Sequence, residues 1–217
     1  MLRVLSFVLV LVCLSPAFAQ EPADSTPEDP SYQLFELRWT NTLEDRADYI
    51  SDAWFAEYAY VGRHIAFDVV YFTQEYFGER YQEIDIGVGY PLRFDGDKGL
   101  VAAGAYYATS RTPDYQWIAP ALNVIYESRR VGARMLALYY IGLDSTAPDL
   151  YFIDPVRVGY KPAEWLTLGA AGKFVKYRGL TWEKQVGPMV QVTTKIGRFE
   201  LRHFANEELQ LAYTAVW

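Results

Sequence analysis

The sequence has 217 residues, with 20 Lys or Arg, 27 Asp or Glu and a net charge of −7. This acidic balance argues against binding through bulk positive charge, so we expect no nucleic acid among the partners. The single cysteine, Cys13, lies in the first nineteen residues. The rest of the chain therefore has no disulfide, thiolate metal site or catalytic cysteine.

Residues 1–19 have the pattern of a cleaved export signal. Arg3 precedes an apolar run, Val4–Leu14, and the A-x-A motif 17–19 follows it. The run is too short to span a bilayer as a helix, so we predict cleavage after Ala19 rather than a membrane anchor. Residues 20–30 are polar, acidic and rich in proline, which predicts a disordered leader.

Residues 31–217 are predicted to be all-β. Aromatic residues make up 17% of the chain, and no apolar run after the signal is long enough for a membrane-spanning helix. Short segments instead alternate apolar and polar residues between Gly, Pro, Asp and Asn. The expected strands are 32–40, 53–61, 64–73, 81–94, 99–110, 116–127, 132–141, 150–161, 165–176, 185–195, 198–205 and 209–217. The eleventh is short, so a ten-stranded arrangement is the alternative.

The links between these segments alternate between longer and shorter, apart from the last. In an up-and-down barrel every second connection lies on the same rim, and outer-membrane barrels keep short turns on the periplasmic side. Side chains alternate too: Ile84, Ile86 and Val88 share one face, and Glu83 and Asp85 the other. Apolar outside and polar inside is typical of a single transmembrane antiparallel up-and-down β-barrel.

The C-terminal segment carries a resemblance to a known class. Five residues alternate with smaller or polar ones and end on an aromatic: Leu209, Leu211, Tyr213, Ala215 and Trp217. This resembles the terminal β-signal of Gram-negative outer-membrane proteins, although no particular porin or enzyme family is matched. The resemblance implies an integral outer-membrane location, contact with outer-membrane lipid and lipopolysaccharide, and recognition by the barrel-assembly machinery through Leu209, Leu211, Tyr213 and Trp217.

The inward positions predict two charged walls across the lumen. The acidic wall comprises Glu57, Asp68, Glu83 and Asp85, and the basic wall Arg134, Arg157, Lys173, Lys195 and Arg202; further inward charges include Glu36, Arg38 and Glu200. Opposed walls in a water-filled lumen orient polar solutes and set ion selectivity. The predicted function is therefore passive diffusion of small polar or charged solutes. Alternatively, the charges pair and close the lumen, while inward Gly and Ala residues let Tyr106 and Trp117 fill it.

Two other classes remain open: a lipid-modifying hydrolase or acyltransferase and a closed structural or adhesive barrel. His203, near the outer end of its strand, is the candidate for surface chemistry, but no serine adjoins it. No metal or nucleotide motif is present, so we expect no cofactor and no metal. Asp144 and Asp149 leave calcium binding as an alternative to a solvated loop. Asp154 falls on the apolar face of its segment, which predicts a bulge or a register slip.

Overall fold

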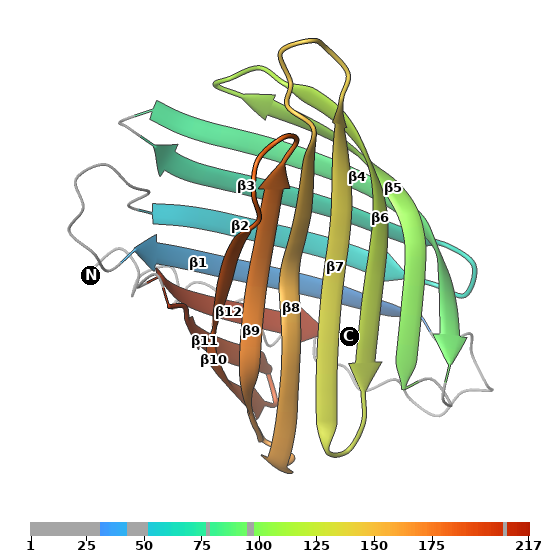
Figure 1. The fold of residues 1–217 in the computed structure, drawn as a ribbon. Coiled ribbons are helices and arrows are strands. Elements are labelled where there is room, and N and C mark those ends of the chain that lie inside the picture. Colours follow the sequence, from blue (N-terminus) through green and yellow to red (C-terminus); the bar gives the residue numbers. More distant parts are fainter. Residues whose placement is uncertain (1–30, 43–51, 77–78, 95–97, 206–207) are drawn as a thin grey trace.

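The computed structural model describes residues 31–42, 52–76, 79–94, 98–205 and 208–217. They form one closed antiparallel barrel of twelve strands (Figure 1). The predicted all-β fold and strand number are confirmed, and the ten-stranded alternative is wrong. The predicted signal, 1–19, and leader, 20–30, lie outside the described residues. In the described part of the chain no helix is long and apolar enough to cross a membrane.

Each strand pairs with its neighbours in sequence, and the first pairs with the last. The strands are β1 Tyr32–Thr42, β2 Asp52–Val61, β3 Ala66–Tyr76, β4 Glu79–Phe94, β5 Gly99–Arg111, β6 Gln116–Glu127, β7 Val131–Gly142, β8 Leu150–Ala163, β9 Leu166–Tyr177, β10 Glu183–Thr194, β11 Gly197–His203 and β12 Glu208–Val216. The short turns 62–65, 128–130, 164–165 and 195–196 share one end with the first and last strands' free ends. We call this the turn end and the opposite end the loop end.

β3 and β4 are longer than the sequence predicted. The ladder continues through Gln74↔Tyr81, Glu75↔Arg80 and Tyr76↔Glu79, so two residues rather than seven separate the strands. These positions are polar or charged, and side-chain alternation therefore gives a weak signal there. Backbone hydrogen bonds do not depend on side-chain polarity, so the hairpin between β3 and β4 extends further at the loop end.

The seam between β1 and β12 closes the barrel. Their register runs from Leu34↔Val216 to Thr42↔Glu208. Beyond it, the Gln33 amide donates to the Trp217 carbonyl at 2.8 Å, and the Trp217 amide donates back at 3.1 Å. Lipid offers no hydrogen bonds to an open sheet edge, so a spanning sheet has to close. The last residues of the chain therefore complete the backbone pairing of the first strand.

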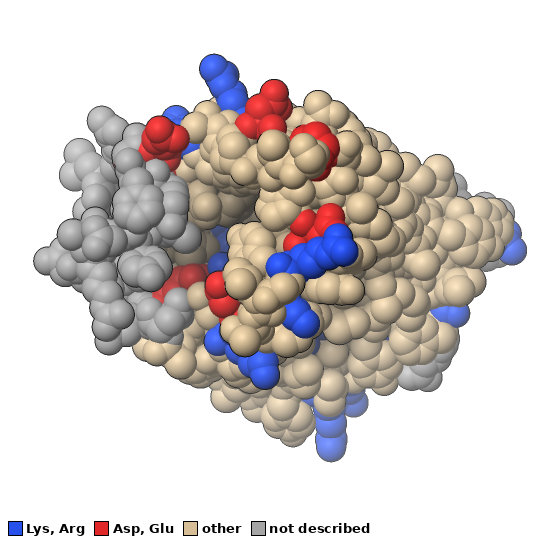
Figure 2. Space-filling model, turned by 45° about the horizontal axis from the view of Figure 1, so that its top comes forward, with Lys and Arg blue, Asp and Glu red and all other residues tan. Residues whose placement is uncertain are grey.

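The two faces of the sheet differ as predicted. Ile84, Ile86 and Val88 are 45–59% exposed on the outside, whereas Asp85 is 5% exposed on the inside. The flank visible in Figure 2 is largely free of charged side chains, which gather at the ends and around a hollow at the loop end. An apolar flank with an enclosed polar interior is the arrangement required by a surrounding bilayer.

A bulge in β8 lies at an acid that faces the lumen. The register of β8 with β9 shifts between Ile153 and Val156, around Asp154 and Pro155. Asp154 is buried, and its Oδ2 accepts a hydrogen bond from Arg38 Nη1 at 2.6 Å. Of the bulge and the register slip that the sequence left open, the structure shows the bulge. Asp154 shares the inward face with Phe152, which packs in the lumen. One extra residue then reverses the side-chain phase, so that Val158 and Tyr160 face outward although each lies an even number of residues from Asp154.

We expect deletion of Trp217 to prevent assembly, because it removes two seam hydrogen bonds and the aromatic end of the predicted signal. The truncated protein should accumulate in the periplasm when expressed in a Gram-negative host, as measured by membrane fractionation. Trp217→Phe keeps the backbone bonds and an aromatic ring, so it should insert as wild type does. Full insertion of the truncated protein would contradict this assignment.

Candidate functional site

Eight buried charged residues form a cluster across the lumen. Four are arginines and four are carboxylates, and no side chain of the eight is more than 10% exposed. This charge cluster comprises Glu36 and Arg38 from β1, Glu57 from β2, Arg134 from β7, Asp154 and Arg157 from β8, and Glu200 and Arg202 from β11. Barrel closure places β1 and β2 opposite β7 and β8, which joins residues about a hundred positions apart in sequence.

Glu36 is the centre of the charge cluster. Its side chain is fully buried, and Oε2 accepts hydrogen bonds from Arg134 Nη1 at 3.0 Å and Arg157 Nη2 at 3.1 Å. Oε1 lies 3.6 Å from Arg38 Nε and 4.0 Å from Arg202 Nη2. One carboxylate thus faces four guanidinium groups, whose mutual repulsion in a low-dielectric interior would otherwise be large.

Each arginine also has a second carboxylate partner. Arg134 Nη2 donates to both oxygens of Glu57, at 2.7 and 3.0 Å. Arg157 Nη1 donates to Glu200 at 3.0 Å, and Arg202 Nε donates to the same carboxylate. Arg38 completes the set with Asp154. The eight charges therefore balance, as burial demands, since an unpaired buried charge is strongly unfavourable.

The predicted acidic wall divides into two parts. Glu57 is ion-paired across the lumen to Arg134 of the predicted basic wall. The other three acids accept hydrogen bonds from tyrosines within their own half of the barrel. The pairs are Tyr106 with Asp68 at 2.5 Å, Tyr140 with Asp85 at 2.8 Å, and Tyr81 with Glu83. Of the four predicted acids, Glu57 is thus ion-paired across the lumen, whereas Asp68, Glu83 and Asp85 are hydrogen-bonded to tyrosines.

Aromatic side chains fill that half of the lumen. Tyr106, Trp117 and Tyr140 are 3–8% exposed, and Trp117 packs edge-on against Tyr140 with ring centroids 5.9 Å apart. Gly87 makes room for Tyr106, because a Cβ there would lie 2.5 Å from the ring. Of the two possibilities that the small inward residues left open, the structure shows aromatic filling rather than empty space.

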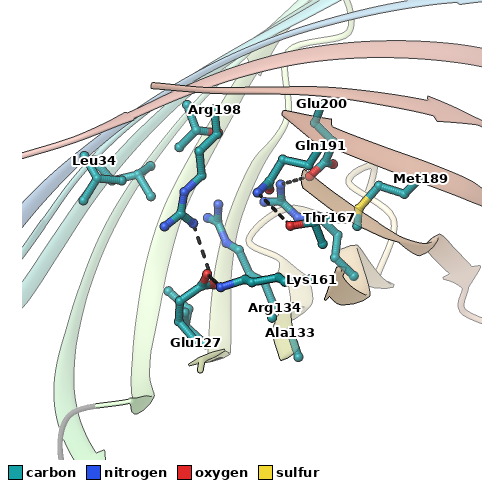
Figure 3. Close-up of a pocket in the computed structure, with 15 residues that line it drawn as sticks. Leu34, Glu127, Ala133, Arg134, Lys161, Thr167, Met189, Gln191, Arg198 and Glu200 are labelled. Atoms are coloured by element: carbon teal, nitrogen blue, oxygen red, sulfur yellow. Dashed lines mark hydrogen bonds and ion pairs between the residues drawn. The ribbon is translucent and has the colours of Figure 1, made fainter. Parts of the chain in front are cut away.

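The charge cluster borders a cavity at the turn end. Figure 3 shows this cavity, which has a volume of about 90 Å³, with Arg134, Thr167 and Glu200 among its lining side chains. At its rim Glu127 contacts Lys161, and Arg198 Nη1 lies 3.7 Å from Glu127 Oε2. A cavity of this size holds several water molecules. The arginines of the cluster are therefore reachable by water from the turn end.

The remaining predicted basic residues differ in position. Lys173 is 24% exposed inside the barrel, and its Nζ lies 3.9 Å from Glu208 Oε2. Lys195 is exposed in the turn between β10 and β11 and lies apart from the charge cluster, which corrects its assignment to the basic wall. Its segment ends one residue earlier than predicted, at Thr194, because a two-residue turn begins at Lys195.

Sequence reasoning missed one polar link in the lumen. Arg202 Nη1 donates to Gln210 Oε1 at 3.0 Å, and Gln210 Nε2 donates to Glu208 Oε1 at 2.8 Å. Gln210 occupies an inward position of the C-terminal segment, between Leu209 and Leu211. The alternation of apolar and polar residues in that segment is the signal that places Gln210 inside the lumen.

Two aspartates in the loop between β7 and β8 accept hydrogen bonds that stabilise the loop. Asp144 accepts hydrogen bonds from the Thr146 hydroxyl and from the amides of Ala147 and Thr146, and these bonds hold the pKa of its carboxyl below the usual value. Asp149 accepts from the Gly142 amide and from Arg178. Within the described ranges no group of three His, Cys, Asp or Glu residues is placed to hold a metal ion.

Solved structures share this architecture at very low sequence identity. The KdgM porin, in complex with disordered oligogalacturonate, superimposes with a TM-score of 0.55 at 7% identity over 86% of this chain and 98% of the porin. The NanC porin gives 0.56 at 10% identity, over 84% and 98%. Outer membrane phospholipase A from Escherichia coli gives 0.47 at 13% identity, over 92% and 98%. No protein-family model and no curated protein matches the sequence.

The chain has the fold of a twelve-stranded outer-membrane porin. At these identities the likeness establishes the fold, and function has to be argued from the lumen. His203, the candidate for enzyme chemistry, pairs with Leu209 at the end of β11 and is exposed. Its neighbour Arg202 points into the charge cluster, so His203 faces the opposite side of the sheet, away from the lumen.

Glu36→Gln should destabilise the barrel strongly, because four arginines would lose their common carboxylate. We expect the free energy of unfolding to fall by roughly 3 kcal/mol or more, as when one partner of a buried ion pair is removed. Urea unfolding of the folded protein in lipid vesicles, followed by tryptophan fluorescence, measures this change. Glu164→Gln, the same substitution in an exposed turn, should change the stability little. Equal stability of the two variants would contradict a central role for Glu36.

Proposed function

We propose that the chain is an outer-membrane channel for the passive diffusion of small polar or charged solutes. The observation that carries this proposal is the charge cluster itself, which spans the lumen between opposite walls of a barrel with an apolar exterior. A barrel that served only as a membrane anchor would be filled as well by apolar side chains. The porin fold and the predicted export and assembly signals support the outer-membrane location.

The cluster is the constriction of this channel. Arg134 bridges Glu36 and Glu57, and Arg157 bridges Glu36 and Glu200, so each guanidinium already shares two carboxylates. A carboxylate on a solute presents the same paired oxygens to these arginines as the protein's own acids do. Such a solute exchanges one ion pair for another as it moves. The KdgM porin, whose structure contains oligogalacturonate, supports a charged solute of this kind.

The lumen in this arrangement is narrow. The cluster side chains are at most 10% exposed, and a second cavity, lined by Asp68 and Tyr106 among others, measures only about 40 Å³. Passage therefore depends on side-chain displacement within the cluster. We expect a small conductance that responds strongly to truncation of the cluster.

Removal of one ion pair from the cluster tests the channel. Glu57→Ala combined with Arg134→Ala leaves the net charge unchanged but removes two long side chains from the constriction. Single-channel recording in planar bilayers at high salt should show discrete openings for wild type and a severalfold larger conductance for the double variant. Glu164→Ala with Lys195→Ala makes the same change in exposed turns and should conduct as wild type does. An unchanged conductance in the cluster variant would contradict its role as the constriction.

Selectivity tests the basic wall separately. Lys173→Glu changes the lumen charge by two units at a side chain whose ion pair is loose, at 3.9 Å. The reversal potential in a salt gradient should shift toward cation preference, because fixed negative charge raises the local cation concentration. Lys195→Glu carries the same change outside the cluster and should shift it much less. Equal shifts of the reversal potential in the two variants would contradict a specific role for Lys173 in ion selectivity.

The closed structural or adhesive barrel is the second candidate. Two observations favour it: the balanced charges of the cluster and the aromatic filling around Tyr106, Trp117 and Tyr140. Folded protein that gives no openings, either as wild type or after truncation of the cluster, would support this alternative. We expect no catalysis, and phospholipid hydrolysis that disappears in His203→Ala would overturn that expectation.

A further inference from the structure

A group of aromatic and basic side chains lies on the outer surface of β7–β10 at the loop end. Tyr139 and Tyr151 stack with ring centroids 4.3 Å apart, and Trp182 lies 6.0 Å from Tyr151. Lys176 places its Nζ 5.8 Å from the Trp182 ring. With Lys184 and Arg178, these residues form what we call the aromatic–basic patch.

The pairing of the strands places this patch outside the barrel. Lys176 is opposite Tyr151, and it lies an even number of residues from Leu168, which is 45% exposed on the outer surface. Lys184 is exposed and likewise shares its face with Val186, which is 50% exposed. Lys184 pairs with Phe174, two residues from Lys176, so the two lysines are diagonal neighbours roughly 7–8 Å apart at Cα.

The patch carries excess positive charge beside an apolar surface. Arg178 is 81% exposed and uses Nη1 to bind Asp149 at 3.0 Å, so other donors of its guanidinium face solvent. Glu183, the nearest acid on β10, pairs with Val175 and so faces the lumen side. Three cations thus accompany one carboxylate. The loop that joins β9 and β10 adds Leu180, which is 62% exposed.

The position of the patch determines the class of partner. In outer-membrane barrels the longer loops face outward, so this rim lies at the headgroup level of the outer leaflet. Aromatic rings suit that boundary, and clustered Lys and Arg residues bind anionic lipid headgroups. Acyl chains would lie against the apolar flank below, while phosphates meet the three cations. A soluble anion would use only the charges and would leave the adjoining apolar surface uncovered.

We propose that the aromatic–basic patch binds the phosphorylated glucosamine headgroup of lipopolysaccharide, with Lys176, Arg178 and Lys184 as phosphate ligands. The proposal rests on the outer-membrane placement of the barrel and is independent of whether the lumen conducts. Tyr151 lies at the level of Lys176, and Trp182 lies beside both at the loop end.

The test uses the folded full-length barrel in detergent micelles. Native mass spectrometry measures binding of diphosphorylated lipid A and of the same lipid without phosphates. Wild type should prefer the phosphorylated lipid by at least about tenfold, since each basic residue near an anionic lipid surface contributes a factor of roughly five. Equal binding of the two lipids by wild type would overturn the proposal, whatever the variants show.

Matched variants locate the site. Lys176→Gln with Arg178→Gln and Lys184→Gln should weaken binding of the phosphorylated lipid by about tenfold or more. Arg63→Gln with Arg129→Gln and Arg130→Gln removes the same charge from exposed positions at the turn end and should leave binding unchanged. The single variant Lys184→Gln, at an exposed position, should bind the phosphorylated lipid severalfold more weakly. It replaces the triple variant in the comparison if the triple variant folds poorly. Equal losses in the two triple variants would overturn the assignment.

Discussion

The structure depends on the backbone hydrogen bonds that close the sheet. A strand edge exposed to lipid would leave its amides and carbonyls without partners, at several kcal/mol for each group. The pairing of β1 with β12, completed by Gln33 and Trp217, removes the last free edges. Once the sheet is closed, alternate side chains are enclosed by the opposite wall. Closure therefore creates both the apolar flank and the interior in which charged groups have to find partners.

The interior meets this requirement in two different ways. Toward β1, β8 and β11, Glu36 and its neighbours form balanced ion pairs that reach across the lumen. Toward β3–β7, tyrosines donate to Asp68 and Asp85 and fill the space between walls. The first solution leaves a cavity beside Arg134 that is large enough for several water molecules. The second is compact and hydrophobic, as shown by the packing of Trp117 on Tyr140.

These two halves suggest where solutes interact with the protein. A charged solute can replace one partner in an ion-pair network, because a guanidinium group donates hydrogen bonds to any suitably placed carboxylate or phosphate. It gains nothing comparable from a tyrosine-filled wall. The lumen route we propose therefore follows the arginine side. On the outer surface, the aromatic–basic patch is the site that we propose for lipid headgroups.

Much of the fold could be predicted because the signals for barrel strands and loops lie in residues that are close together in the sequence. Alternation with a period of two sets each strand and its outward face, as at Ile84 and Ile86, and loop lengths set the two ends. The bulge at Asp154 was predictable for the same reason, since a charged residue on the apolar face conflicts with the pattern. Strand ends were less certain: charged positions such as Glu75 and Arg80 still pair, and Lys195 begins a turn.

The sequence by itself indicated a closed β-barrel of twelve strands, with ten as the alternative, and with charges inside. Which charge meets which was decided only by the tertiary structure. Glu36 lies near Arg134 and Arg157 because closure, strand tilt and the β8 bulge bring β1 against β7 and β8 at one particular height. Likewise, the inward glycines allow either an open lumen or a filled one. Only the packed structure shows Tyr106 lying over Gly87, because side-chain volume is shared among strands and no single segment encodes it.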